Sequence, residues 1–247
     1  MMGRTLLRVC FAALGLGMAG AAHSADYDGQ LPDEGFNGFM SCLYARIDGG
    51  VSLYDRPTVT QPIGAGFDNG SGGITATAIN SEIDDAGFIE GGIGCQVAST
   101  MRIEITGGAT LKSSLTDAFP DSLDTEIGSQ YVFVSTFWDI TDYAGFTPYI
   151  GGGIGAARNE ISGLTAPSGA ADGSDYDFAY HVDVGVSYDI TPSLKFDLAY
   201  RYLDLGDVIS GVDLTAPAAD QGAISVAGIQ SHEIKFGLRY HFGEPAW

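Results

Sequence analysis

The chain has few basic residues. Its 247 residues include 11 lysines and arginines against 31 aspartates and glutamates, which gives a formal net charge of −20. Proteins that bind nucleic acid neutralise phosphates with Lys and Arg, so this charge balance argues against a nucleic-acid partner. The apolar fraction of 45% is also too high for an acidic disordered tail.

Long apolar runs are missing beyond the N-terminus. No later segment reaches the roughly 18 apolar residues of a transmembrane helix, so we expect none in the exported chain. Residues 1–24 are typical of an export signal, because Arg4 and Arg8 precede a short run of apolar and small residues. Cleavage after Ser24 fits the small-x-small rule, and loss of the two arginines takes the net charge from −20 to about −22.

Cysteine is scarce as well. Cys10 lies in the predicted signal, which leaves Cys42 and Cys95 in the exported chain. An even number of cysteines in an oxidising compartment favours a disulfide. Two packed free thiols remain the alternative, because Cys95 falls on the apolar face of its strand while Cys42, if the strand reached it, would fall on the charged face. Cys42 precedes the first regular strand, so its direction is free.

What the chain has instead is alternation. In residues 231–242 apolar side chains occupy the even positions from Ile234 on, and charged or small ones occupy the odd positions. This period of two predicts a strand with one apolar and one charged face. Similar windows are found at residues 43–54, 87–97, 100–111, 129–140, 147–158, 176–190, 194–205 and 231–242. In 129–140 both faces are apolar, so its orientation stays open.

The connections between these windows alternate in length. The short ones are 98–99, 141–146 and 191–193, and the long ones are 55–86, 112–128, 159–175 and 206–230. Outer-membrane barrels sort their turns in this way, with short turns in the periplasm and long loops outside. The sequence therefore predicts an all-β fold, an eight-stranded antiparallel up-and-down transmembrane β-barrel. The expected parts are a signal peptide (1–24), a periplasmic segment (25–42), the barrel (43–242) and a short tail (243–247).

The charged faces carry both signs, and they collect most of the scarce bases. An eight-stranded barrel is just wide enough inside for side chains to fill it, and each charge there needs a partner. We therefore expect a largely plugged lumen. The predicted ion-pair network consists of Arg46, Glu90, Arg102, Glu104, Asp183, Asp197, Arg201, Glu233, Lys235 and Arg239. If Ile190 opposes Leu194 across the turn at 191–193, Asp183 lies opposite Arg201.

Three stretches resemble a known family: 147–157 (TPYIGGGIGAA), 200–206 (YRYLDLG) and 237–242 (GLRYHF). They are similar to the small eight-stranded outer-membrane β-barrel proteins of Gram-negative bacteria, the porin-like or outer-membrane-protein A-like barrel domains. The resemblance spans residues 43–242. It implies a location in the outer membrane, contact with outer-membrane lipid and lipopolysaccharide, insertion by the barrel-assembly machinery, and a monomer.

The resemblance also implies an insertion signal in the last strand. The expected residues of this signal are Phe236, Leu238, Tyr240 and Phe242. Members of the family usually end on the aromatic residue of that strand, whereas here residues 243–247 follow Phe242. The signal is expected at Phe242, with Trp247 as the alternative.

No motif for a catalytic nucleophile, a cofactor or a metal stands out, so we expect no catalytic, cofactor-binding or metal residues. The leading interpretation is a structural or surface-interaction barrel, whose loops, rich in Gly, Ala, Ser and Asp, suit mobile hydrated surface segments. A narrow porin-like pore for small solutes is the alternative. A lipid-modifying barrel enzyme is the third class, and His181 is expected to be a packing residue of the lumen beside Asp183.

Overall fold

The computed structural model describes residues 41–61, 77–80, 82–116, 125–163, 170–212, 223 and 225–243. The predicted signal peptide, almost all of the predicted periplasmic segment and residues 244–247 of the tail lie outside these residues. None of the helices in the described part is long and apolar enough to cross a membrane.

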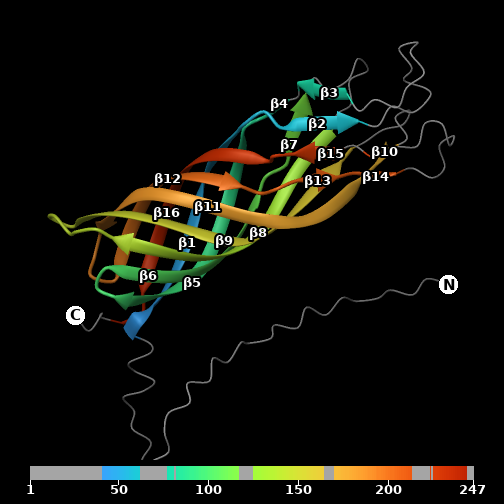
Figure 1. Ribbon diagram of the computed structural model, residues 1–247. Coiled ribbons are helices and arrows are strands. Elements are labelled where there is room, and N and C mark those ends of the chain that lie inside the picture. The colour runs from blue at the N-terminus through green and yellow to red at the C-terminus, as the bar shows by residue number, and fades with distance from the viewer. Residues whose placement is uncertain are drawn as a thin grey trace, which may run out of the picture. The chain divides into compact units, whose positions relative to one another are not determined.

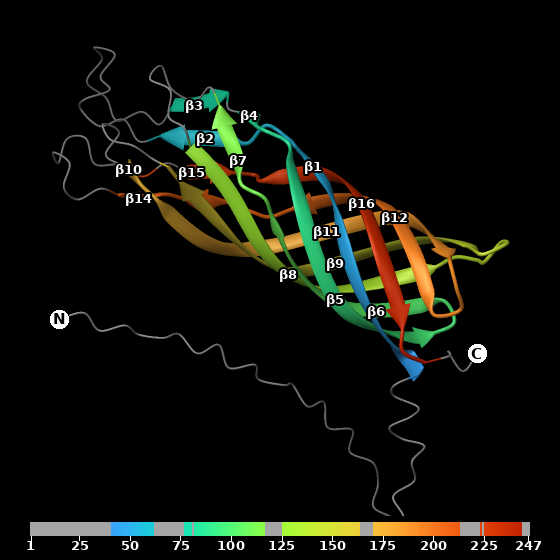
Figure 2. The same ribbon diagram turned by 180° about the vertical axis from the view of Figure 1, so that it is seen from behind.

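Eight long antiparallel strands form the body of the fold (Figures 1 and 2). They are β1 (Leu43–Tyr54), β5 (Ala86–Ala98), β6 (Met101–Thr110), β8 (Thr125–Asp139), β9 (Phe146–Ser162), β11 (Gly173–Asp189), β12 (Leu194–Asp204) and β16 (Gln230–His241). Each pairs with the next in this series, and β16 pairs back onto β1. The sheet is therefore closed, which confirms the predicted eight-stranded up-and-down barrel and pairs its backbone within the protein.

The two faces of the wall differ as the alternation requires. On β16 the even-numbered side chains from Ile234 to Tyr240 are exposed on the outer wall, and the odd-numbered ones from Glu233 to His241 are buried inside. The window that is apolar on both faces, now β8, turns Tyr131, Phe133 and Phe137 inward. These rings fit because the inward positions of β9 opposite them are small: Ala157 faces Tyr131, Gly155 faces Phe133 and Gly151 faces Phe137.

One prediction tests the outer face. Leu198 is 39% exposed in the middle of β12, between Val186 and Phe236 of the neighbouring strands. Leu198→Arg should destabilise the barrel by about 2–4 kcal/mol, because an arginine near the bilayer midplane lies in hydrocarbon. Urea unfolding in lipid vesicles measures this change. Tyr143→Arg, at an 81% exposed position of a short turn, is the matched control and should cost about 0–1 kcal/mol. Equal effects of the two variants would contradict the assigned faces.

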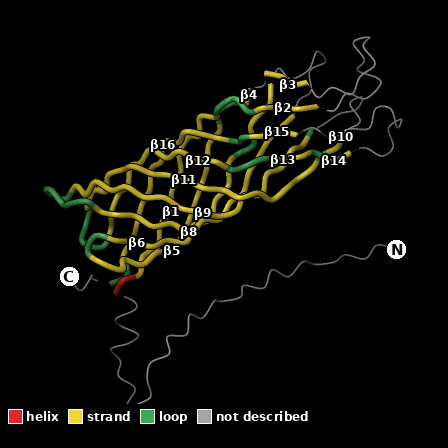
Figure 3. The backbone as a smooth tube through the Cα atoms, viewed as in Figure 1, coloured by secondary structure: helices red, strands yellow, loops and turns green. Residues whose placement is uncertain are grey.

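Short turns join the strands at one end of the barrel, which we call the short-turn end (Figure 3). The β8–β9 connection was expected to be a six-residue turn at 141–146. Six residues, 140–145, separate β8 from β9. At the tip of this connection Tyr143 bridges to Phe146, and Ala144 and Gly145 lie between them at φ of 54° and 81°. Positive φ at both central residues is typical of a type I′ hairpin turn, which matches the twist of the strands.

The opposite, long-loop end carries further short strands. β2 (Thr58–Gln61), β3 (Thr77–Asn80), β13 (Val208–Ile209) and β15 (Ser225–Ala227) form a four-stranded sheet in the order β13-β15-β2-β3. β4 (Glu82–Ile83) pairs with β7 (Ser113–Thr116), and β10 (Ala170–Ala171) pairs with β14 (Gly211–Val212). In the described parts of the long connections, short paired strands with buried apolar side chains thus stand where hydrated loops were expected.

The physical reason is an apolar cluster that these strands bury together with the ends of the barrel strands. We call it the apolar cap; its residues are Val59, Ile83, Leu115, Ile127, Tyr131, Phe133, Ala157, Ile161, Ala179, Leu203, Leu205, Val208, Val226 and Ile229. Buried Asn159 ties the connection after β12 to this end by donating to Leu205 O (2.8 Å) and Asp207 O (3.1 Å). Burial of apolar surface stabilises the described short strands at this end of the barrel.

Candidate functional site

The charged side chains of the barrel interior are the densest polar group in the described part of the chain. All ten residues of the predicted ion-pair network are inside, each at most 5% exposed. Asp48, Asp139, His181 and His241 are buried with them. Charges so far from water need close partners of opposite sign, and the contacts fall into two groups along the barrel.

The first group is centred on Arg201. Its guanidinium donates to both carboxylate oxygens of Glu90, at 2.9 and 3.1 Å, and through Nε to Asp183 at 3.0 Å. Lys235 lies 3.3 Å from Asp183 and 3.6 Å from Glu90. Glu233 accepts from Ser52 at 2.7 Å and lies 3.6 Å from Arg201. The register places Asp183 opposite Arg201, as the turn at 191–193 requires.

The second group lies nearer the short-turn end. Arg46 binds Asp48 and Glu104 through contacts of 2.6 Å. Further contacts join Arg102 to Glu104 (3.2 Å) and Asp139 (2.9 Å), and Arg239 to Asp197 (3.1 Å). Every carboxylate of the two groups has an arginine within 4 Å, so the buried charges of the interior are paired.

Lys195 and Asp189 mark the edge of this interior. The Lys195 side chain is 22% exposed at the start of β12 and binds Asp189 at 2.6 Å. Three further bases are exposed or half-exposed: Arg56, Lys112 and Arg158 pair with Glu82, Glu126 and Glu160. The interior therefore takes five of the bases, all in direct contact with acids.

Sequence reasoning missed one arrangement, in which His181 is central. Ser135 Oγ lies 2.9 Å from His181 Nε2, and Nδ1 of the same ring contacts Asp183. This is the order of groups in a serine-hydrolase triad. All three residues are at most 3% exposed, and the edge of the ring packs on Phe133. Ser135, His181 and Asp183 thus form a buried hydrogen-bonded chain inside the barrel wall.

Gly153 makes the Ser135–His181 bond possible. It sits between the two residues in the register, since β9 runs between β8 and β11, and it faces the interior. A Cβ at this position would collide with Ser135 Oγ and lie 2.9 Å from the backbone oxygen of Val134. No short sequence motif signals this contact, because the three residues lie on three different strands.

We expect Gly153→Ala to destabilise the barrel by about 1–3 kcal/mol, the usual result of overpacking a closed interior. Gly107→Ala is the matched control: it also changes a strand glycine, but the added Cβ lies 3.6 Å from its nearest neighbour, Tyr131 O. Thermal unfolding of both variants in one detergent measures the difference. Equal midpoints for Gly153→Ala and Gly107→Ala would count against the packed interior.

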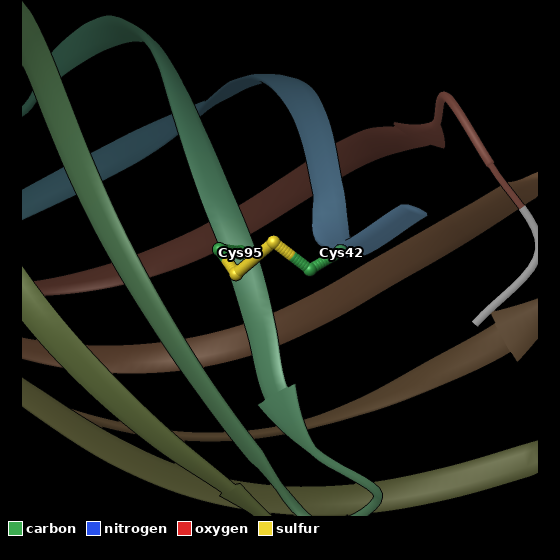
Figure 4. The surroundings of a disulfide bond; sticks show 2 residues. All are labelled: Cys42 and Cys95. Atoms are coloured by element: carbon green, nitrogen blue, oxygen red, sulfur yellow. A yellow bond between two sulfur atoms is a disulfide. The ribbon is translucent and has the colours of Figure 1, made fainter. Parts of the chain in front are cut away.

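Cys42 and Cys95 form a disulfide at the short-turn end (Figure 4). Their Cα atoms are 4.8 Å apart, within the usual range, and 53 positions separate them in the sequence. Cys95 pairs with Leu43, the residue that follows Cys42. Cys42 precedes β1, so the alternation of side chains along that strand does not fix the direction of its own side chain. The two cysteines can therefore meet although alternation would place them on opposite faces.

The residues of the predicted insertion signal line the outer wall. Phe236, Leu238, Tyr240 and Phe242 are 45–52% exposed there, and the Tyr240 and Phe242 rings pack edge to face. Their use as a signal stays a prediction. Within the described ranges, no three His, Cys, Asp or Glu side chains are arranged to hold a metal ion.

A closed eight-stranded barrel with an apolar outer wall and a charged interior defines a transmembrane barrel of the outer-membrane class. The family model described as "Outer membrane protein beta-barrel domain" matches residues 11–242, and the chain belongs to that family. The protein is therefore located in the bacterial outer membrane.

The sequence identity to individual relatives is low. The chain is 28% identical over 140 residues to the outer membrane protein PagN of Salmonella typhimurium. The aligned part covers 51% of this chain and 56% of PagN. It thus spans about half the length of that relative. A Rickettsia bellii protein named "Putative adhesin" is 24% identical over 215 residues, covering 80% of this chain and 86% of that protein.

The solved structure of the outer membrane protein OprG from Pseudomonas aeruginosa has the same fold. It aligns with a TM-score of 0.56 at 14% sequence identity, covering 81% of this chain and 97% of OprG. At this identity the likeness concerns the fold alone.

Proposed function

We propose that the protein is a closed outer-membrane barrel that makes contacts at the cell surface through its long-loop end and does not serve as a pore. The observation that carries the proposal is the interior: five buried bases and their carboxylate partners occupy the lumen, where a pore would need water. The apolar cap stands over this network at the long-loop end. Buried Ser135 likewise supports a role without catalysis.

The long-loop end has the build of a contact surface. The four-stranded sheet and the apolar cap give it an ordered base, and ordered loops on a rigid scaffold are the usual carriers of recognition. Exposed acids gather there: Asp55, Glu82, Asp84, Asp85, Glu126, Asp172, Asp175 and Asp207. This charge favours partner surfaces that are basic. The Rickettsia bellii relative named as an adhesin agrees with a surface role.

The remaining partners are part of the same proposal. The apolar outer wall is suited to outer-membrane lipid and lipopolysaccharide, and the last strand to the barrel-assembly machinery. The closed barrel pairs its long strands with one another, so it needs no second copy to cover a sheet edge.

Attachment of living cells tests the surface role. Bacteria that produce the protein should attach to a monolayer of cultured animal cells more than bacteria without it, and less at high salt, because acid–base contacts are screened. A variant in which Asp55, Glu82, Asp84 and Asp85 are replaced by their amides should lose attachment. Asp142→Asn, a single charge change in a short turn, is the control and should attach like the original protein. Equal attachment by the four-amide variant would overturn the proposed role.

A further inference from the structure

The mouth of the barrel at the short-turn end holds a cavity of about 200 Å³. Its walls come from the β5–β6 turn, the β8–β9 hairpin and the ends of β11, β12 and β16. At about 30 Å³ for each water molecule, the space equals some six or seven waters and suits a molecule well below drug size. The second group of the ion-pair network lies directly inside it, so the cavity is a dead end.

Arg239 gives the cavity its first chemical feature. It is 2% exposed and lines the cavity, and its Nη2 donates to Ser187 Oγ (2.8 Å) and Asp197 Oδ1 (3.1 Å). Its Nε has no hydrogen-bond partner among the described residues. Because that Nε is itself fully buried, the cavity meets the positive charge of the guanidinium and not a free donor, and an anionic group in the cavity is attracted to that charge. Lys195, also in the wall, adds a second positive charge.

Carboxylates supply the opposite sign in the same cavity. Asp142 lies in the β8–β9 hairpin, where one oxygen accepts from the Thr147 hydroxyl at 3.1 Å. Asp139 ends β8, and only its Oδ1 is engaged by Arg102 in the described part of the chain. The cavity thus presents two bases and two acids within a space of about 200 Å³.

We propose that this cavity binds a small zwitterion, an α-amino acid whose carboxylate meets Arg239 and Lys195 and whose ammonium group meets Asp139 and Asp142. A simple anion would satisfy the arginine but face two carboxylates, and a simple cation would face the two bases. A molecule with both charges on one carbon matches both sets, and like-charge contacts reject the others. The site opens toward the periplasm, the side of the short turns.

Calorimetric titration of the refolded full-length barrel in lipid nanodiscs tests the site. The probes are L-alanine, acetate, methylammonium and glycylglycine. We expect L-alanine to bind at least tenfold more tightly than acetate or methylammonium, and glycylglycine, whose two charges are further apart, to bind more weakly than L-alanine. Equal affinity for acetate and L-alanine, or no heat with any probe, would overturn the proposal.

Variants keep the test specific. Asp142→Asn should weaken L-alanine at least tenfold, and it changes an exposed turn residue outside the buried network. Asp85→Asn, an equally exposed acid at the long-loop end, is the control and should bind as the original protein does. Unchanged binding by Asp142→Asn would remove the ammonium site. Asp142 lies in the β8–β9 turn, away from the acids of the proposed contact surface, so loss of L-alanine binding by Asp142→Asn is independent of the proposed surface role.

Discussion

Arg201→Met should destabilise the barrel by about 3–5 kcal/mol, the usual effect of leaving buried charges without their partner. Arg201 is 1% exposed and holds Glu90, Asp183 and Glu233 together, so its loss leaves three carboxylates with Lys235 as their one remaining base in this group. Urea unfolding in lipid vesicles, followed by the mobility of folded and unfolded chains in gels, gives the free energy.

A double-mutant cycle separates the ion pair from simple loss of packing. Arg201→Met with Glu90→Gln should cost at least about 1 kcal/mol less than the two single changes added together, because the double variant removes both charges. Lys112→Met with Glu126→Gln is the matched control: those side chains are 51% exposed, and the coupling should be below about 1 kcal/mol. Additive effects at Arg201 and Glu90 would mean that the interior is hydrated.

Replacing Cys42 and Cys95 by serine should lower the unfolding free energy by about 4 kcal/mol, because a bridge across 53 positions limits the unfolded chain. Trp138, 56% exposed on the outer wall, is a fluorescent reporter of the loss of the barrel in lipid. The original protein unfolded with a reductant present is the control, and it should match the double serine variant. Two titratable thiols in the unfolded, unreduced protein would contradict the bridge.

Strands and their faces could be predicted from the sequence wherever the two faces differ in chemistry. In β16, charged residues alternate with apolar ones. The apolar side chains face the lipid and the charged ones face the lumen, so the pattern alone fixes the orientation of the strand. In β8 both faces are apolar, and what decides the orientation is a property of another strand, the inward glycines Gly151 and Gly155 of β9. A pattern within one strand does not contain that information.

The long-loop end and the Ser135–His181 contact were missed for related reasons. Short strands such as β13, with two residues, are too brief to show a period, and the apolar cap assembles from segments far apart in the sequence. No sequence motif marks Ser135, because its partner His181 lies two strands away and Gly153 stands between them. The Asp183–Arg201 pairing, in contrast, follows from one short turn, since a hairpin of known length fixes its register.

Single-channel recording in planar lipid bilayers tests the central claim, a lumen closed by its own ion pairs. With the purified barrel inserted at low protein density, and an open porin as a positive control, we predict no steady openings at any moderate voltage. Steady conductance of the original protein, with an ion preference that changes when Arg46, Arg102 or Arg201 is replaced, would show that ions pass along the charged interior. That result would contradict the closed barrel and favour a selective pore.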